Sequence, residues 1–211
     1  MIPPDFPWTN TPLHELPFVV LDLETTGIEP STSAITEVAM VTAGPGPEEI
    51  FDTLIDPQQP IPPEVVKLTG ITDEMVRGKP TLREVMPIIV SILEGSIFVS
   101  HNVPFDWGFL DLASREYLGK PLRMHSLCTL RLARRYLNLP ANKLAMVARS
   151  FGLDLQEAHR ALADTQAVKG ILRRMLDLLH SKGIKTGGDL VRNDLLFLNA
   201  PPPRPSGPRR P

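Results

Sequence analysis

The chain has 211 residues, a single cysteine (Cys128) and a formal net charge of −2, and these figures exclude several classes of protein. One cysteine cannot form an intramolecular disulfide framework or a metal site with several cysteine ligands. The charge is uneven: residues 1–100 carry 4 basic and 15 acidic side chains, whereas residues 101–211 carry 18 and 9. Such asymmetry is typical of a nucleic-acid-binding face beside an acidic site, and two ordinary solvated surfaces would give the same pattern.

The sequence shows no membrane or export signal. Its longest mostly apolar run, residues 85–93, is much shorter than the roughly 20 residues needed to cross a bilayer. The first residues contain no basic stretch followed by an apolar run. We therefore expect a cytoplasmic protein without membrane contact.

Proline marks both ends of the chain. Five prolines fall in residues 1–17 and six in residues 201–211, and segments so rich in proline are expected to be extended. We therefore predict a Pro-rich amino-terminal tail over residues 1–15, one folded domain over residues 16–180, and a carboxy-terminal appendage with a Pro-rich tail over residues 181–211.

The predicted domain begins with strands. Residues 18–23 are apolar except for Asp22, too continuously apolar for a half-exposed strand, which predicts a central strand covered on both faces. Residues 34–42 and 51–55 are predicted to be its antiparallel neighbours, joined through the turn at Gly44–Pro47.

Helices and strands alternate after that point. Residues 81–93 are predicted to form a helix, with Thr81 as its N-cap and Glu84 completing a capping box. The remaining predicted elements are strands over 96–100 and 123–128 and helices over 105–118, 129–136, 143–151 and 161–180. This order predicts an α/β fold with a mixed sheet of about five strands, flanked by helices.

Two acids end the first strand. Asp22 and Glu24 are two residues apart, so both side chains point to one face of the strand. Carboxylates held together at the end of a buried strand repel each other unless a cation compensates, and oxygen ligands suit Mg²⁺ or Mn²⁺. A strand that ends at the surface with two solvated acids would look the same.

Later in the chain, four further polar residues stand at or near element boundaries. Asp106 lies near the start of a predicted helix, where an acid can serve either catalysis or helix capping, and His101 could be a hydrogen-bonded strand-end histidine. His159 and Asp164 are five residues apart, about 140° around a continuous helix. They can share one site only if His159 lies in the loop before the helix.

The order of these residues resembles that of a known family, the DEDDh branch of the DnaQ-like 3′→5′ exonucleases, which includes the epsilon proofreading subunit of bacterial DNA polymerase III. The five matching catalytic positions are Asp22, Glu24, Asp106, His159 and Asp164. Further matching segments are Leu68–Asp73, Cys128–Arg134 and Asn142–Leu144. The resemblance runs from Phe18 to about Leu176 and implies a ribonuclease H-like fold with a mixed five-stranded sheet flanked by helices.

The resemblance also implies a mechanism. Two divalent cations, Mg²⁺ or Mn²⁺, would be bound by the four carboxylates: Asp22 would contact both, Glu24 and Asp164 the one that carries the attacking water, and Asp106 the other. His159 would take the proton from that water. The product would be a nucleoside 5′-monophosphate released from a 3′ end.

Substrate contacts implied by the resemblance are Thr25, Thr26, Glu64, Asn102, Phe105 and Lys143. Phe105 would stack on a base, although a phenylalanine near a helix start also suits the core. Thr69 replaces the histidine of many relatives. Residues 113–152 hold eight basic side chains and one acid, Glu116, and some of the eight are expected to contact phosphates.

The expected substrate is a single-stranded or frayed 3′ end of DNA, with proofreading in DNA replication as the expected role. RNA or short oligonucleotides are the alternative substrate. A second alternative is a polymerase-binding module with incidental nuclease activity, whose partners would be a replicative DNA polymerase and a sliding clamp. Residues Asn193–Phe197 loosely resemble the end of a clamp-binding peptide, but an amphipathic packing segment would have the same pattern.

Overall fold

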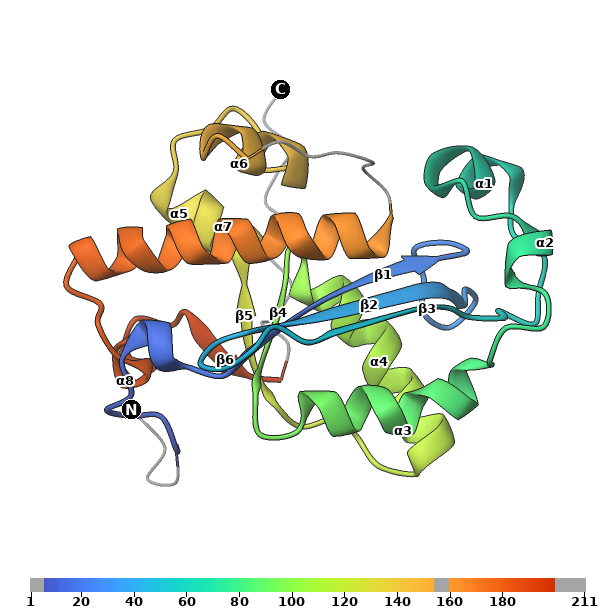
Figure 1. Ribbon diagram of the computed structural model, residues 1–211, viewed down its shortest axis with the longest axis horizontal. Coiled ribbons are helices and arrows are strands. Elements are labelled where there is room, and N and C mark those ends of the chain that lie inside the picture. Colours follow the sequence, from blue (N-terminus) through green and yellow to red (C-terminus); the bar gives the residue numbers. More distant parts are fainter. Residues whose placement is uncertain (1–5, 154–159, 200–211) are drawn as a thin grey trace, which may run out of the picture.

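The computed structural model describes residues 6–153 and 160–199 of the chain (Figure 1). In these residues a sheet of six strands runs in the order β3-β2-β1-β4-β5-β6. The strands are β1 (Phe18–Thr25), β2 (Ile35–Ala43), β3 (Ile50–Leu54), β4 (Ile97–Ser100), β5 (His125–Cys128) and β6 (Leu196–Leu198). The helices are η1 (Leu13–Glu15), α1 (Pro63–Thr69), α2 (Asp73–Val76), α3 (Leu82–Leu93), α4 (Val103–Leu118), α5 (Thr129–Tyr136), α6 (Leu144–Ser150), α7 (Ala161–Ser181) and α8 (Gly187–Arg192). The α/β class and the mixed sheet are as predicted, with one strand more.

The sheet mixes both strand directions. β1 is antiparallel to β2 and parallel to β4, β4 is parallel to β5, and β5 is antiparallel to β6. β3 pairs with β2 and not with β1, so only one of the two predicted antiparallel neighbours of β1 contacts it. β1 is covered on both faces, as the apolar run Phe18–Leu21 predicts: Val20 packs into one core and Leu21 into the other.

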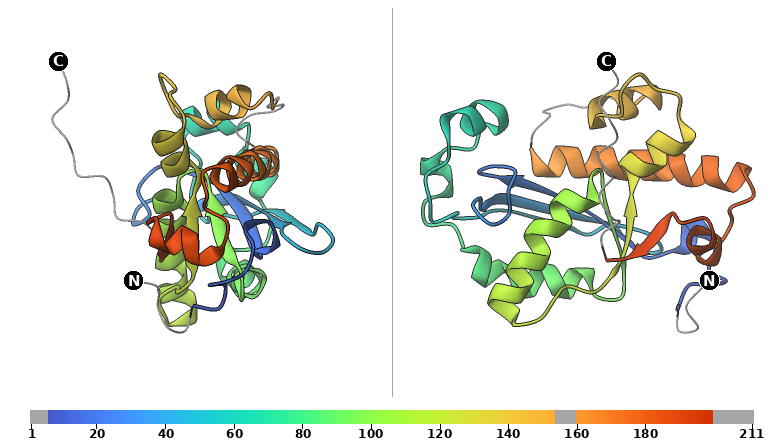
Figure 2. Two further views of the ribbon diagram at one scale, coloured as in Figure 1. Left: turned by 90° about the vertical axis from the view of Figure 1, so that its left-hand side faces the viewer. Right: turned by 180° about the vertical axis from the view of Figure 1, so that it is seen from behind.

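Two hydrophobic cores lie on opposite faces of this sheet. α7 crosses one face and α3 and α4 cover the other (Figures 1 and 2). The predicted capping box begins α3: Glu84 Oε2 accepts hydrogen bonds from the backbone amide of Thr81 at 2.7 Å and from its hydroxyl at 2.8 Å. α4 begins directly after β4 and α7 begins beside the end of β1, so the first turns of both helices lie near the carboxyl end of the central strand.

Packing extends past the boundaries expected at residues 16 and 180. Phe6 and Leu13 are 5% and 1% exposed and belong to the core under α7, and Leu195 and Leu196 are buried in the same core. The apolar side chains between the prolines supply this burial, which a count of prolines overlooks. Residues 1–5 and 200–211, the outer parts of the predicted tails, lie outside the described residues.

The segment at residues 193–197 is part of this packing. The backbone carbonyl of Asn193 accepts a hydrogen bond from Arg135 Nη1 at 2.6 Å, and the guanidinium of Arg131 lies 4.5 Å from the centroid of the Phe197 ring. Of the two interpretations of this segment, the structure therefore favours amphipathic packing. Among the described helices, none has both the length and the hydropathy to span a bilayer.

Candidate active site

Asp22 and Glu24 lie at the carboxyl end of β1, on the face of the sheet that α7 covers. In the register with β2, Asp22 lies opposite Ala39 and Glu24 opposite Glu37, and the register shifts between Glu24 and Thr25. Both acids are half-buried. The period of the strand thus places two carboxylates side by side where its apolar stretch ends.

Asp164 joins them from the other end of the sequence. It lies on the first turn of α7, where its backbone amide donates to the carbonyl of Arg160 at 3.0 Å, and it is 8% exposed. One carboxylate oxygen from each of Asp22, Glu24 and Asp164 lies within 4.8 Å of the other two. These three predicted site residues therefore form one cluster.

Asp106 lies on the first turn of α4 and is 3% exposed. Burial raises its pKa to about 7, although the Ser100 hydroxyl and the backbone amides of Asp106 and Leu23 lower it in part. Its negative charge is the strongest of the charges that raise the pKa of Asp22. Asp106 therefore acts on the cluster electrostatically and is more than a helix cap.

The electrostatics of the cluster favour a cation. Burial, followed by the charges of Asp106, Glu24 and Asp164, raises the pKa of Asp22 well above its usual value. Burial and the charge of Asp164 raise the pKa of Glu24 to about 8. Carboxylates in this condition are neutral at pH 7 unless a cation compensates them, and a divalent cation would compensate several at once. The donor set, which consists of carboxylate oxygens, fits Mg²⁺ or Mn²⁺.

The predicted substrate residues at the β1–β2 connection have structural partners. The Thr25 hydroxyl donates to the carbonyl of Gly27 at 2.6 Å. The Thr26 hydroxyl oxygen accepts hydrogen bonds from the backbone amide of Ala34 at 2.9 Å and from Nε2 of Gln59 at 2.6 Å. Both hydroxyls thus shape the turn beside Glu24.

The other predicted substrate residues lie on three helices or their N-caps: α4, α1 and α6. Asn102 is exposed at the N-cap of α4. Phe105 is partly buried against the core between the sheet and the helices α3 and α4. Its ring centroid lies 5.2 Å from that of Phe109, so packing accounts for part of its surface. Glu64 on α1 and Lys143 at the N-cap of α6 are both exposed.

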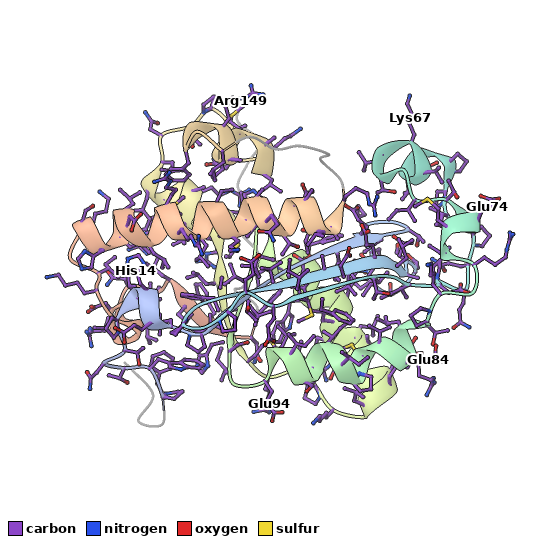
Figure 3. All side chains as sticks on the ribbon, in the orientation of Figure 1. His14, Lys67, Glu74, Glu84, Glu94 and Arg149 are labelled. Atoms are coloured by element: carbon purple, nitrogen blue, oxygen red, sulfur yellow. The ribbon has the colours of Figure 1, made fainter. Side chains whose placement is uncertain are left out.

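α1 and α6 stand on the same side of the sheet as α7 (Figures 1 and 2). Figure 3 shows Lys67 and Arg149 pointing outward from α1 and α6. The exposed basic side chains of this side, Arg149 among them, are therefore available to a ligand that approaches from solvent.

Two histidines of the sequence analysis have different outcomes. His101 is held between Thr129 Oγ1, 3.0 Å from Nδ1, and the carbonyl of Asn142, 2.9 Å from Nε2, and burial lowers its pKa. It is the hydrogen-bonded strand-end histidine that the sequence allowed, and it ties β4 to α5 and to the loop before α6. His159 lies outside the described residues.

Sequence reasoning missed Glu37. This glutamate on β2 lies directly opposite Glu24, is 1% exposed, and raises the pKa of both Asp22 and Glu24. A signal was present, because Glu37 is the only charged residue between Ile35 and Val41. An acid within an apolar strand has a partner or a function.

Comparison of this chain with known proteins points to the same kind of site as the geometry does. Residues 19–172 match the family profile described as exonuclease. The chain is 38% identical over 167 residues to the DNA polymerase III subunit epsilon of Aquifex aeolicus, which covers 78% of this chain and 83% of that protein. It is also 39% identical over 188 residues to a Mycobacterium tuberculosis protein that carries the name bifunctional exonuclease/endonuclease protein, but there the match covers 84% of this chain and only 29% of the relative.

A solved structure is similar as well. The structure described as exonuclease X in complex with 5′ overhanging duplex DNA has a TM-score of 0.63 to this chain and 26% sequence identity, covering 79% of this chain and 93% of the other. The acidic cluster lies within residues 19–172, the segment that matches the exonuclease profile. The other residues whose order resembles this family, Asp106 and His159, fall within the same segment of the sequence. The chain therefore belongs to the exonuclease family, among the DnaQ-like exonucleases with a ribonuclease H-like fold.

Proposed function

We propose that this protein is a metal-dependent 3′→5′ exonuclease that removes nucleoside 5′-monophosphates from the 3′ end of DNA. The observation that supports this most is the cluster of Asp22, Glu24 and Asp164, whose carboxylate oxygens lie within 4.8 Å of one another and whose mutual repulsion a divalent cation would relieve. Membership of the exonuclease family supports the reaction class.

The four carboxylates would hold two divalent cations, Mg²⁺ or Mn²⁺. When bound, such ions neutralise charge on the phosphate and lower the pKa of a bound water. Asp22 and Glu24 would contribute from the carboxyl end of β1, and Asp106 and Asp164 from the first turns of α4 and α7. His159 would accept the proton of the attacking water, for which an imidazole with a pKa near neutrality is suited.

DNA is the proposed substrate because the relatives carry names or titles that refer to it: a DNA polymerase III subunit and an exonuclease in complex with duplex DNA. Thr25, Thr26, Glu64, Asn102, Phe105 and Lys143 are proposed to contact the terminal nucleotides. RNA remains the alternative substrate, since both would bind through the same phosphates.

One experiment tests polarity, sugar preference and metal dependence together. 3′-labelled and 5′-labelled strands of DNA and RNA are incubated with the protein in Mg²⁺, in Mn²⁺ and in chelator. We expect immediate release of labelled mononucleotide from 3′-labelled DNA, a ladder from 5′-labelled DNA, and neither in chelator. Cleavage that persists in chelator would contradict the metal assignment, and faster loss of RNA than of DNA would establish the alternative substrate.

A role in replication requires a partner, which we propose is a replicative DNA polymerase. The similarity to the epsilon subunit supports this association, whereas the packing of residues 193–197 against Arg131 and Arg135 weakens the sliding-clamp interpretation. Co-purification with a replicative polymerase tests the association. The segment responsible is sought with a chain that ends at Asn199, because removal of residues 181–199 would delete α8 and β6 from the fold.

A further inference from the structure

Glu37 is a buried carboxylate next to the acidic cluster with no assigned role. It lies on β2, opposite Glu24 on β1, and only 1% of it is exposed. A charged group in this position is strongly destabilising unless it is paired and hydrogen-bonded. The groups that pair with the Glu37 carboxylate therefore indicate its role.

Both partners of Glu37 belong to the start of α7. Arg160, the N-cap of this helix, places Nη2 2.8 Å and Nε 3.3 Å from Glu37 Oε1. Ala161, the first residue of the helix, donates its backbone amide to Glu37 Oε2 at 2.9 Å. An arginine side chain has no acceptor, so Arg160 cannot cap the free amides of its own helix. A carboxylate from β2, 124 residues earlier than Ala161, supplies the cap and places a negative charge at the positive end of the helix dipole.

Asp164 lies on the same first turn. Its amide donates to the carbonyl of Arg160 at 3.0 Å, so the peptide unit that carries Asp164 is bonded to the residue that Glu37 holds. One residue further, the Thr165 hydroxyl donates to the carbonyl of Ala161 at 2.6 Å and completes that turn. The position of the Asp164 carboxylate relative to Asp22 and Glu24 therefore depends on how firmly the helix start is fixed on β2.

We propose that Glu37, through Arg160 and the amide of Ala161, is a positioning residue that holds the first turn of α7 on the sheet and so keeps Asp164 at the distance from Asp22 and Glu24 that a divalent cation requires. This proposal rests on the proposed metal-dependent function. It adds a part of the site that touches neither cation nor substrate.

Charge alone predicts a different outcome for Arg160. Its positive charge lowers the pKa of Glu24 and disfavours a cation nearby. If only the electrostatic field mattered, loss of Arg160 would strengthen cation binding, while loss of the Glu37 charge would weaken it. If positioning matters, loss of either partner weakens cation binding. The two explanations therefore differ in the sign of the effect at Arg160.

The experiment measures Mn²⁺ binding to the full chain by calorimetry, without substrate. We expect Glu37→Gln and Arg160→Gln each to bind Mn²⁺ about tenfold more weakly or worse, as for other residues that orient metal ligands. The double variant is expected to be no weaker than the weaker single variant, because both substitutions break one interaction. Arg160 has a partly exposed side chain, so Arg160→Gln is expected to fold even if Glu37→Gln does not.

A matched control is Glu48→Gln. Glu48, in the connection between β2 and β3, forms an ion pair with Lys169 in the middle of α7, so this substitution also removes an ion pair to that helix but leaves its first turn intact. Its Mn²⁺ affinity is expected to stay within twofold of wild type. A second readout is hydrogen exchange at the Ala161 amide, which is expected to accelerate in Glu37→Gln and to be unchanged in Glu48→Gln.

Unchanged or tighter Mn²⁺ binding by Arg160→Gln would overturn the proposal, as would an equal loss of affinity in Glu48→Gln. These outcomes can be distinguished from the result expected if the proposed metal-dependent function itself is wrong. In that case the wild-type chain itself would neither bind Mn²⁺ nor degrade DNA in its presence.

Discussion

Two carboxylate sites in this molecule lie under opposite electrostatic conditions. Asp189, on the first turn of α8, accepts hydrogen bonds from the backbone amide of Lys185 and from Arg192 and Thr186, and these donors lower its pKa to about 2. Glu24, at the end of β1, lies half-buried among other carboxylates, and its pKa rises to about 8. The same chemical group thus stabilises structure where donors surround it and is prepared to bind a cation where other acids surround it.

The two sites should differ most in activity and thermal stability when one acid of each is replaced by its neutral amide. Asp164→Asn is expected to reduce nuclease activity by roughly 10³-fold or more, as for loss of a group that stabilises charge in the transition state. Without metal the variant should unfold at the same temperature as wild type or higher, because one repelling charge is removed. Release of 3′-label and thermal melting in chelator measure the two effects. The comparison variant Asp189→Asn should melt earlier and remain active, and an active Asp164→Asn would contradict the assignment.

A smaller loss is expected at the proposed general base. His159→Ala should lower kcat by about 10²-fold or more while Mn²⁺ binding is retained, because proton transfer by a positioned side chain contributes about that much. Single-turnover cleavage of labelled DNA is the measurement. His14, an exposed histidine on η1 beside Asp177, is the control, and His14→Ala should be fully active. Equal rates for His159→Ala and wild type would contradict the assignment of His159 as the general base.

The raised pKa values predict how stability depends on pH in the absence of metal. Between the unfolded value near 4.5 and the folded value of about 8, Glu24 retains its proton when folded and loses it when unfolded. The free energy of unfolding should therefore fall as pH rises through this range, by up to about 1.4 kcal/mol per pH unit for each such group. Asp106, with a pKa of about 7, adds to the same trend.

Urea titrations between pH 5 and 8.5, in chelator and in excess Mg²⁺, measure this dependence. Mg²⁺ should flatten the decline, because a bound cation keeps the carboxylates ionised and compensated at every pH in the range. A metal-free stability that rises toward pH 8 would contradict the pKa shifts at Glu24 and Asp106.

The smallest expected effect is at the structural acid. Asp189→Ala removes the capping-box partner of Thr186 and should cost about 1 kcal/mol of stability at pH 7, the usual effect of a lost helix cap. Because the pKa of Asp189 is lowered, its contribution is complete above about pH 4 and is lost as pH falls through about 2. The difference in unfolding free energy between wild type and variant should therefore shrink at pH 2. If the difference in unfolding free energy is as large at pH 2 as at pH 7, it arises from packing of the side chain and not from its charge.

Local sequence predicted the parts of the site that depend on local geometry. The strand period placed Asp22 and Glu24 on one face, and the pattern at Thr81 and Glu84 located the start of α3. Asp106 could not be distinguished from a helix cap, because what makes it more than a cap is the parallel pairing of β1 with β4, which brings two distant chain segments together.

The missed features depend on contacts between distant residues. Glu37 gains its role from Arg160, 123 residues later, and no local pattern links them. β6 has only three residues and forms a strand because the edge of β5 is available to it. α1 and α2, of seven and four residues, fall in a stretch broken by prolines, where helical periodicity is too short to detect.

The addition of β6 to the sheet has a practical consequence for fragments of this chain. Residues 125–127 would keep their partners on β4 but lose those on β6 if the chain were cut at residue 180, and the apolar surface now covered by Leu195 and Leu196 would face water. An open strand edge beside bare apolar surface invites pairing with other molecules and precipitation. A fragment meant to stay dispersed at high concentration should therefore retain the chain through Asn199.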